Sequence, residues 1–244
     1  TACTPTKEST IDTTLQSKVV SILQNKMSEI GAISGQAIVM EVQTGEIKTM
    51  VGNGISQESG LIRTASLLTA LETGKVKLSD TVDVGEGVYM VHDKELLDHN
   101  WHRGGYGKLT TLQGLMVNSH IANYKNIERA FTEEQAYFDM LNKMSYGQPE
   151  NIEGLDDLKA AHFITPNDSG WNNTSLAWFC IGYNQQISPI QMLTFYNAIA
   201  NNGKMVKPTL YKGETEIINP QIASKANIDS LQMALVKVVT EGLG

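Results

Sequence analysis

The sequence is short of several features that would assign it to a specialised class. Its 244 residues include only two cysteines, Cys3 and Cys180, too few for a disulfide framework or a cysteine-ligated zinc site. No apolar run approaches the roughly 20 residues that a membrane-spanning helix needs. Basic residues number 19 against 26 acidic ones, and the formal net charge of −7 argues against nucleic acid or an anionic membrane surface as the main partner.

What remains has the composition of an ordinary globular protein. Hydrophobic residues make up 41% of the chain and charged residues 18%, values that argue against a disordered or fibrous protein. A chain of 244 residues can bury a substantial core. The length fits one large domain, or one domain with an insert.

The two cysteines lie in different contexts. Cys180 follows an apolar stretch, and we interpret it as a small core residue. Thr1-Ala2-Cys3 resembles the end of a bacterial lipoprotein signal, in which the cysteine becomes the lipidated first residue of the mature chain. The alternative is a chance cysteine near the terminus, and the sequence leaves both interpretations open.

A helix that is apolar on almost every side is predicted between Gly60 and Gly74. At about 100° per residue, its leucines, isoleucine and alanines leave no clean polar face, and only Arg63 and Glu72 carry charge. Such a helix must be buried, and Gly74 supplies the usual left-handed stop. We therefore predict a central helix whose first turn, which carries Arg63, meets the cleft of the protein.

Two elements are predicted before this helix. A surface helix begins at Asp12 or Thr13, has apolar residues at helical spacing and stops at Gly31. Two runs rich in β-branched residues, 36–42 and 47–51, flank a turn with a central glycine. This pattern predicts a β-hairpin.

Two capping boxes predict helices in the middle of the chain. In each, a threonine is followed three residues later by a glutamine: Thr110 by Gln113, and Thr132 by Gln135. The second of these helices is expected to run to about Gly147.

Further along the chain, serine, proline and glutamine at 188, 189 and 191 specify the start of another helix, which ends near residue 203. An apolar face at helical spacing predicts a last helix over about 227–240.

A polar loop invites a metal hypothesis because it contains His92, Asp93, Asp98, His99 and His102. Imidazole and carboxylate groups at short spacing are ligands that zinc or iron would accept. However, the spacing matches no defined motif, and loops near clefts collect polar side chains. We interpret these residues as solvated or hydrogen-bonded and predict neither a metal nor a cofactor.

Four stretches carry a resemblance to a known family, in that family's order: 37–48, 64–72, 104–108 and 181–208. The most specific is the last, which reads IGYNQQISPIQMLTFYNAIANNGKMVKP. Together they resemble the transpeptidase domain of high-molecular-weight, class B penicillin-binding proteins, in the form found in Bacteroides-like bacteria.

This resemblance implies an α+β fold of the penicillin-binding-protein and serine β-lactamase type, with an antiparallel sheet and a helical region at about 108–150. It implies a single transpeptidase-like domain over 1–244. Because the family continues into a K-T-G strand and further strands, and the sequence stops at Gly244, we expect the C-terminal strands to be missing.

The family's catalytic motifs are altered in this sequence. In the family, S-x-x-K opens the central helix and places a nucleophilic serine one turn from a lysine that takes its proton. Gly60 and Arg63 stand at these two positions, and Asn118-Ser119-His120 stands where S-x-N is expected. Glycine has no nucleophile and arginine stays protonated. The sequence contains no S-x-x-K, S-x-N or K-T-G.

Two explanations compete. Either the domain kept the scaffold and lost the chemistry, or an active D-alanyl-D-alanine transpeptidase has its motifs in residues outside this sequence. A β-lactamase-type serine hydrolase is a third candidate, although it would need the same serine. We favour degeneracy, because Arg63 and His120 lie inside well-matched stretches, and we assign no residue a catalytic role.

The remaining expectations follow from this hypothesis. Ser59, Arg63, Ser119 and His120 are the candidate substrate-binding residues, with Arg63 and His120 facing each other across the cleft and favouring a carboxylate. Expected ligands are the peptidoglycan stem peptide or a β-lactam bound non-covalently, and a division or elongation protein is a candidate partner. The resemblance places the protein in the cell envelope, on the periplasmic side, with Cys3 as a candidate lipid anchor.

The hairpin raises a question of its own. An isolated two-stranded hairpin is marginal in water, and this one would expose an apolar face and an open edge. We therefore expect either that the encoded protein continues past Gly244 with further strands, or that two chains form a homodimer through the hairpin edge.

Overall fold

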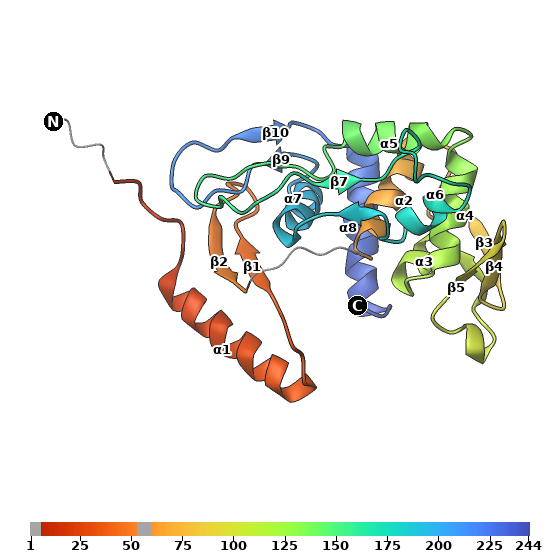
Figure 1. Cartoon of the computed structure of the whole chain (residues 1–244), viewed down its shortest axis with the longest axis horizontal. Coiled ribbons are helices and arrows are strands. Elements are labelled where there is room, and N and C mark those ends of the chain that lie inside the picture. The colour runs from red at the N-terminus through yellow and green to blue at the C-terminus, as the bar shows by residue number, and fades with distance from the viewer. Residues whose placement is uncertain (1–5, 53–59) are drawn as a thin grey trace.

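The computed structural model describes residues 6–52 and 60–244, and its architecture is α+β, as predicted (Figure 1). The helices are α1 (Thr13–Ile30), α2 (Ile62–Glu72), η1 (Trp101–Arg103), α3 (Thr111–Met116), α4 (His120–Ala130), α5 (Glu134–Lys143), α6 (Ser175–Phe179), α7 (Pro189–Ala200) and α8 (Lys225–Thr240). The strands are β1 (Ala37–Met40), β2 (Ile47–Val51), β3 (Thr81–Gly85), β4 (Val88–Val91), β5 (Lys94–Leu97), β6 (Gly107–Thr110), β7 (His162–Phe163), β8 (Gln185–Gln186), β9 (Met205–Val206) and β10 (Ile217–Asn219).

Helix α1 begins and ends at the two caps that the sequence predicted. The Asp12 carboxylate accepts a hydrogen bond from the Leu15 amide at 2.9 Å, and Gly31 ends the helix in the left-handed conformation with φ of 67°. The helix lies to one side of the molecule and packs on β2 (Figure 1). None of its residues is fully buried, as expected for a surface helix.

Strands β1 and β2 form the predicted antiparallel hairpin, in which Ile38 pairs with Met50. These two side chains pack against a small apolar cluster that includes Ile152 and Ile190. A groove of about 680 Å³ remains between this hairpin, the segment 154–160 and the start of α7. The apolar face of the hairpin is therefore only partly covered by the residues that the structure describes.

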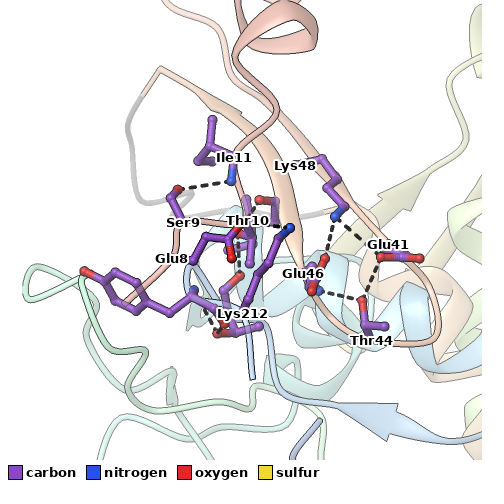
Figure 2. A network of polar contacts seen from close by, with 12 residues as sticks. Glu8, Ser9, Thr10, Ile11, Glu41, Thr44, Glu46, Lys48 and Lys212 are labelled. Atoms are coloured by element: carbon purple, nitrogen blue, oxygen red, sulfur yellow. Dashed lines mark hydrogen bonds and ion pairs between the residues drawn. The ribbon is translucent and has the colours of Figure 1, made fainter. Parts of the chain in front are cut away.

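The closed end of the hairpin is held by two segments that are far apart in sequence (Figure 2). The Thr10 amide donates to the Leu210 carbonyl, and the Ile47 amide donates to the Thr209 carbonyl, each at 2.9 Å. The buried Thr10 hydroxyl lies 2.6 Å from the Ile47 carbonyl oxygen and 3.2 Å from that of Thr209. Thr10 thus joins the N-terminal segment, β2 and the segment around residue 210. A separate surface ion pair links Lys48 to Glu46.

We predict that Thr10→Val lowers the free energy of unfolding by about 1–2 kcal/mol, because two buried carbonyl groups lose their hydroxyl neighbour. Thr10→Ser keeps the hydroxyl and serves as the matched control, with a smaller loss. Urea unfolding followed by circular dichroism measures both. A loss in Thr10→Val that is no larger than the loss in Thr10→Ser would contradict the leading role of the hydroxyl at this position.

Helix α2 is the centre of the molecule, as predicted. Nine of its 11 residues are buried, and it packs against α4, α5 and α8. Its polar side chains are satisfied inside: the Ser66 hydroxyl lies 2.8 Å from the Tyr137 hydroxyl, and Thr69 donates to the Ser66 carbonyl at 2.6 Å. The main core cluster gathers around this helix, and Cys180 lies in it fully buried, which confirms its interpretation as a core residue.

One of the two predicted capping boxes in the middle of the chain is wrong. Thr110 and Gln113 form the box that begins α3. Helix α5, in contrast, begins at Glu134 after Glu133, which makes no side-chain cap bond, and ends at Lys143. Around this start, Phe131 packs on Tyr137 with ring centroids 5.8 Å apart, and the Glu134 carboxylate accepts a hydrogen bond from Trp171 at 2.6 Å.

The last two long helices confirm their sequence signals. Ser188 and Gln191 form a complete capping box at the start of α7, with Pro189 in the first helical position. Helix α8 begins two residues earlier than predicted, at Lys225, and ends at Thr240. All strand pairs are antiparallel, but within the described ranges they form five separate two-stranded ladders instead of one broad sheet.

Candidate functional site

One wall of the candidate site is the first turn of α2, which presents Arg63. The helix begins after Leu61, whose side chain makes no cap bond, and residues 53–59 before it lie outside the part of the chain that the structure describes. The Tyr196 hydroxyl of α7 lies 2.8 Å from both the Leu61 carbonyl oxygen and the Thr64 hydroxyl. Tyr196 therefore fixes the turn that carries Arg63.

The opposite wall is the reversal between α3 and α4. Asn118 adopts the left-handed conformation with φ of 54°, and Ser119 caps α4 by accepting from the Ala122 amide at 3.0 Å. Gly114 allows the close approach of the two helices, because a Cβ there would lie 2.7 Å from the Ala122 Cβ. The reversal places Asn118 and Ser119 beside Arg63 in one pocket, whereas His120 begins α4.

Arg63, Asn118 and Ser119 line one small pocket, together with Leu67 and Asn123. Its volume is about 10 Å³, which is room for about one water molecule. The structure therefore brings together three of the positions that the sequence singled out. No ion pair of Arg63 exists among the residues that the structure describes.

The Ser119 hydroxyl is already used within the fold. It donates to the Asp98 carboxylate at 2.8 Å while it accepts from Ala122. Asp98 is fully buried, and its second oxygen accepts from the Ile121 amide at 3.1 Å. A serine hydroxyl has a single proton to donate, so Ser119 has none left for a ligand in this arrangement.

His120 lies at the start of α4, with its Nδ1 atom 3.2 Å from the Leu97 carbonyl oxygen. Burial lowers the pKa of His120 from its ordinary value of 6.5, Asp98 opposes this change, and His99 and Arg63 add to it. Arg63 and His120 are thus close enough to interact electrostatically. That they face each other across the cleft stays a prediction.

Gly60 and Ser59 precede α2, and only Gly60 lies among the described residues. A Cβ added at Gly60 would meet nothing within 4 Å among the described residues, and the glycine does not adopt a positive φ. The backbone at this position would therefore accept a side chain. Ser59 lies outside the described residues, as does Cys3.

The residues of the polar loop that suggested a metal site make separate contacts. His99 bonds to Tyr106 at 2.8 Å and lies 3.1 Å from the Val117 carbonyl oxygen, whereas Asp98 turns inward to α4. His92 and Asp93 are exposed at the β4–β5 turn. Within the described ranges, no group of three or more histidine, cysteine, aspartate or glutamate side chains is placed to hold a metal ion.

Sequence reasoning missed the role of Asp98. Its partners lie more than 20 residues away, at Ser119 and Ile121, so no local spacing pattern joins them. No local signal in the sequence could have found it, because these groups meet only when the loop after β5 packs on the start of α4.

We predict that the free energy of unfolding falls as the pH is lowered from 8 to 5, in part because of His120. The folded state holds the pKa of His120 below 6.5, so the unfolded state takes up the proton first and is favoured as the pH drops through that range. His120→Gln should make the dependence shallower. Urea titrations at several pH values measure this.

The matched control is His92→Gln, which removes an exposed histidine from the β4–β5 turn. It should leave the slope against pH close to that of the parent protein. A parent and a His120→Gln variant with the same slope would contradict the lowered pKa.

Comparisons with known proteins agree with this geometry. A family model described as the penicillin binding protein transpeptidase domain matches residues 35–244. Penicillin-binding protein 2A of Bacillus subtilis is 26% identical, over 94% of this chain and 36% of that protein. Peptidoglycan D,D-transpeptidase FtsI of Escherichia coli is 24% identical, over 79% of this chain and 35% of that protein. The chain thus spans about a third of the length of these relatives.

Solved structures show the same fold. The apo transpeptidase domain of Burkholderia pseudomallei penicillin-binding protein 3 superposes with a TM-score of 0.84 at 21% identity, over 96% of this chain and 71% of that one. A structure described as a peptidoglycan glycosyltransferase from Burkholderia ambifaria gives 0.84 at 20% identity, over 97% and 76%. These similarities confirm the predicted fold class. No helix among the described residues is long and apolar enough to cross a membrane.

Proposed function

Because the chain belongs to the family of penicillin-binding-protein transpeptidase domains, we propose that it binds peptidoglycan stem peptides without forming an acyl-enzyme. The observation that carries this proposal is the pair of residues at the start of α2. Gly60 occupies the position of the family's nucleophile, and Arg63 occupies the position of its base.

Neither residue can perform the family's first chemical step. Acylation needs an oxygen that attacks the carbonyl carbon and a neutral base that takes its proton. Gly60 offers no side-chain atom, and the Arg63 guanidinium stays protonated at any working pH. The scaffold around them is intact, since α2, α4 and the reversal between α3 and α4 are all in place.

The same groups favour a carboxylate. Arg63 lies in the first turn of α2, where its charge and the backbone amides of a helix N-terminus attract an anion. The pocket beside it is lined by the amide side chains of Asn118 and Asn123, which can donate hydrogen bonds. A stem peptide ends in a carboxylate, which gives it the chemistry that this wall recognises.

We predict that the protein forms no covalent adduct with a fluorescent penicillin, whereas a peptide ending in D-alanyl-D-alanine binds reversibly. Intact mass after incubation measures the first, and isothermal titration calorimetry the second. Arg63→Ala should weaken peptide binding about tenfold, because a charged hydrogen bond contributes about 1.5–3 kcal/mol. Arg103→Ala, which removes an exposed arginine from η1, is the control and should bind as the parent does.

A stoichiometric penicillin adduct would overturn this proposal, and its site would identify the alternative. An adduct on Ser59 would indicate an active enzyme with a shifted nucleophile. Gly60→Ser adds the hydroxyl at a position with room for it, and this variant should still form no adduct because Arg63 cannot take the proton.

The family also suggests where the domain works. We place it in the cell envelope, on the periplasmic side, where peptidoglycan is present, with lipidation of Cys3 as one means of attachment. FtsI of Escherichia coli is similar to this chain, and on that basis a division protein is a candidate partner. Mass spectrometry of the protein purified from its native membrane would test the lipid.

The edge of β1 supports a further contact. Among the described residues β1 pairs with β2 alone, and Val39 on this strand is 39% exposed. A polypeptide of residues 1–244 should therefore dimerise through this edge, and Val39→Lys should shift it toward monomer because charges on edge strands oppose pairing. Light scattering at several concentrations measures both. A monomeric parent at high concentration would exclude the dimer.

A further inference from the structure

Asp98 is a fully buried carboxylate that the proposed function does not use. A charge removed from water is costly unless hydrogen bonds and opposite charges compensate for it. Such a residue is therefore held in place by definite partners, and those partners define its role. In this protein the side-chain partners all belong to the first turn of α4.

The two oxygens of the Asp98 carboxylate accept different hydrogen bonds. One accepts the Ser119 hydroxyl at 2.8 Å, and the other accepts the Ile121 amide at 3.1 Å. The Asp98 backbone is also fixed, because its amide donates to the Gly87 carbonyl at 3.0 Å and its carbonyl accepts from Trp101 at 3.1 Å. The carboxylate thus joins a rigid loop to the positive end of an 11-residue helix.

This contact decides what Ser119 can do. Its hydroxyl proton points to Asp98, and one of its lone pairs accepts the Ala122 amide. Ser119 is held as a cap of α4 and is withheld from donating to a ligand. The neighbouring residues Asn118 and His120 remain as the groups of this segment that can face one.

The contact also bears on His120, which follows Ser119 directly. The charged and titratable groups that act on its imidazole are Asp98, His99 and Arg63. Asp98 is the one among them that favours the protonated ring, and it opposes both burial and the guanidinium of α2. The same carboxylate therefore fixes the backbone around His120 and biases its protonation.

We propose that Asp98 is a positioning residue of the candidate site, which locks Ser119 as a helix cap and leaves Asn118 and His120 to meet the ligand. The role in binding rests on the proposed function, whereas the effect on His120 can be measured without any ligand. Asp98 touches no ligand itself and acts through α4.

The test compares Asp98→Asn, Ser119→Ala and a control, Asp229→Asn, which removes an exposed carboxylate from α8. The His120 imidazole is followed by NMR against pH in the free proteins. In Asp98→Asn its pKa should fall by at least about half a unit, as expected on loss of a nearby negative charge. Ser119→Ala and Asp229→Asn should leave it unchanged.

Calorimetry with the D-alanyl-D-alanine peptide then tests the role in binding. Ser119→Ala should bind within about twofold of the parent, because the hydroxyl is not offered to the ligand. A protonated His120 should attract the peptide carboxylate, so binding should strengthen as the pH falls through the His120 pKa. In Asp98→Asn this transition should move to lower pH, as the NMR titration does. Such a shift separates positioning from a merely structural role, which would change affinity at every pH alike.

Two results would overturn the inference. One is a His120 pKa that does not change in folded Asp98→Asn. The other is a Ser119→Ala variant that stays folded but binds the peptide more than tenfold more weakly. If Asp98→Asn does not fold, Ser119→Ala still decides, since direct ligand contact and a capping role predict opposite results. If no variant and no parent binds the peptide, the proposed function fails, while the NMR titration continues to test the role of Asp98.

Discussion

The burial of α2 is the constraint on which the rest of the structure depends. A helix with nine of 11 residues inside the protein needs neighbours on all sides, and α4, α5 and α8 provide them. The buried polar groups of α2 restrict rotation of the helix about its axis, because the Ser66 hydroxyl lies 2.8 Å from the Tyr137 hydroxyl and 3.2 Å from the Cys180 carbonyl oxygen. Leaving any of these buried groups without its hydrogen bond would lower the free energy of unfolding by about 1–3 kcal/mol. The place of Arg63 at the end of this helix follows from that fixed rotation.

The two walls of the cleft are joined by the same interior. The Cys180 carbonyl accepts Ser66 from α2 and also Asn123 from α4, the latter at 2.6 Å. A movement of one wall therefore disturbs the other. On the far side, Asp98 holds the first turn of α4 against the loop after β5. The two sides of the pocket are thus tied to the core by hydrogen bonds that do not involve the side chains of residues 60 and 63.

On the proposed function, this arrangement explains how the scaffold can persist without the family's catalytic motifs. Residues that build the cleft are core residues, and their packing is maintained by stability alone. A Cβ added at Gly60 would meet no described residue within 4 Å, so the packing among the described residues does not require a glycine at this position. The proposed binding by Arg63 relies on its charge and on the N-terminus of α2, both of which the fold supplies.

The sequence by itself determined the features whose causes are local. Asp12 caps α1 and Ser188 caps α7 because each cap and its bonded amide lie three residues apart, so the pattern carries its own geometry. The apolar surface of α2 likewise predicted its burial, whatever its neighbours. Most of the fold class and the place of Arg63 at the cleft could be predicted for this reason.

Only the tertiary structure decided the rest. The box at Thr132 does not form, and the first residue of α5, Glu134, instead accepts a hydrogen bond from Trp171, a contact that no local spacing contains. The role of Ser119 was settled in the same way, by a carboxylate 21 residues earlier in the chain that accepts a hydrogen bond from its hydroxyl. Hydrogen bonds between distant segments depend on how elements pack, and packing is a property of the whole chain.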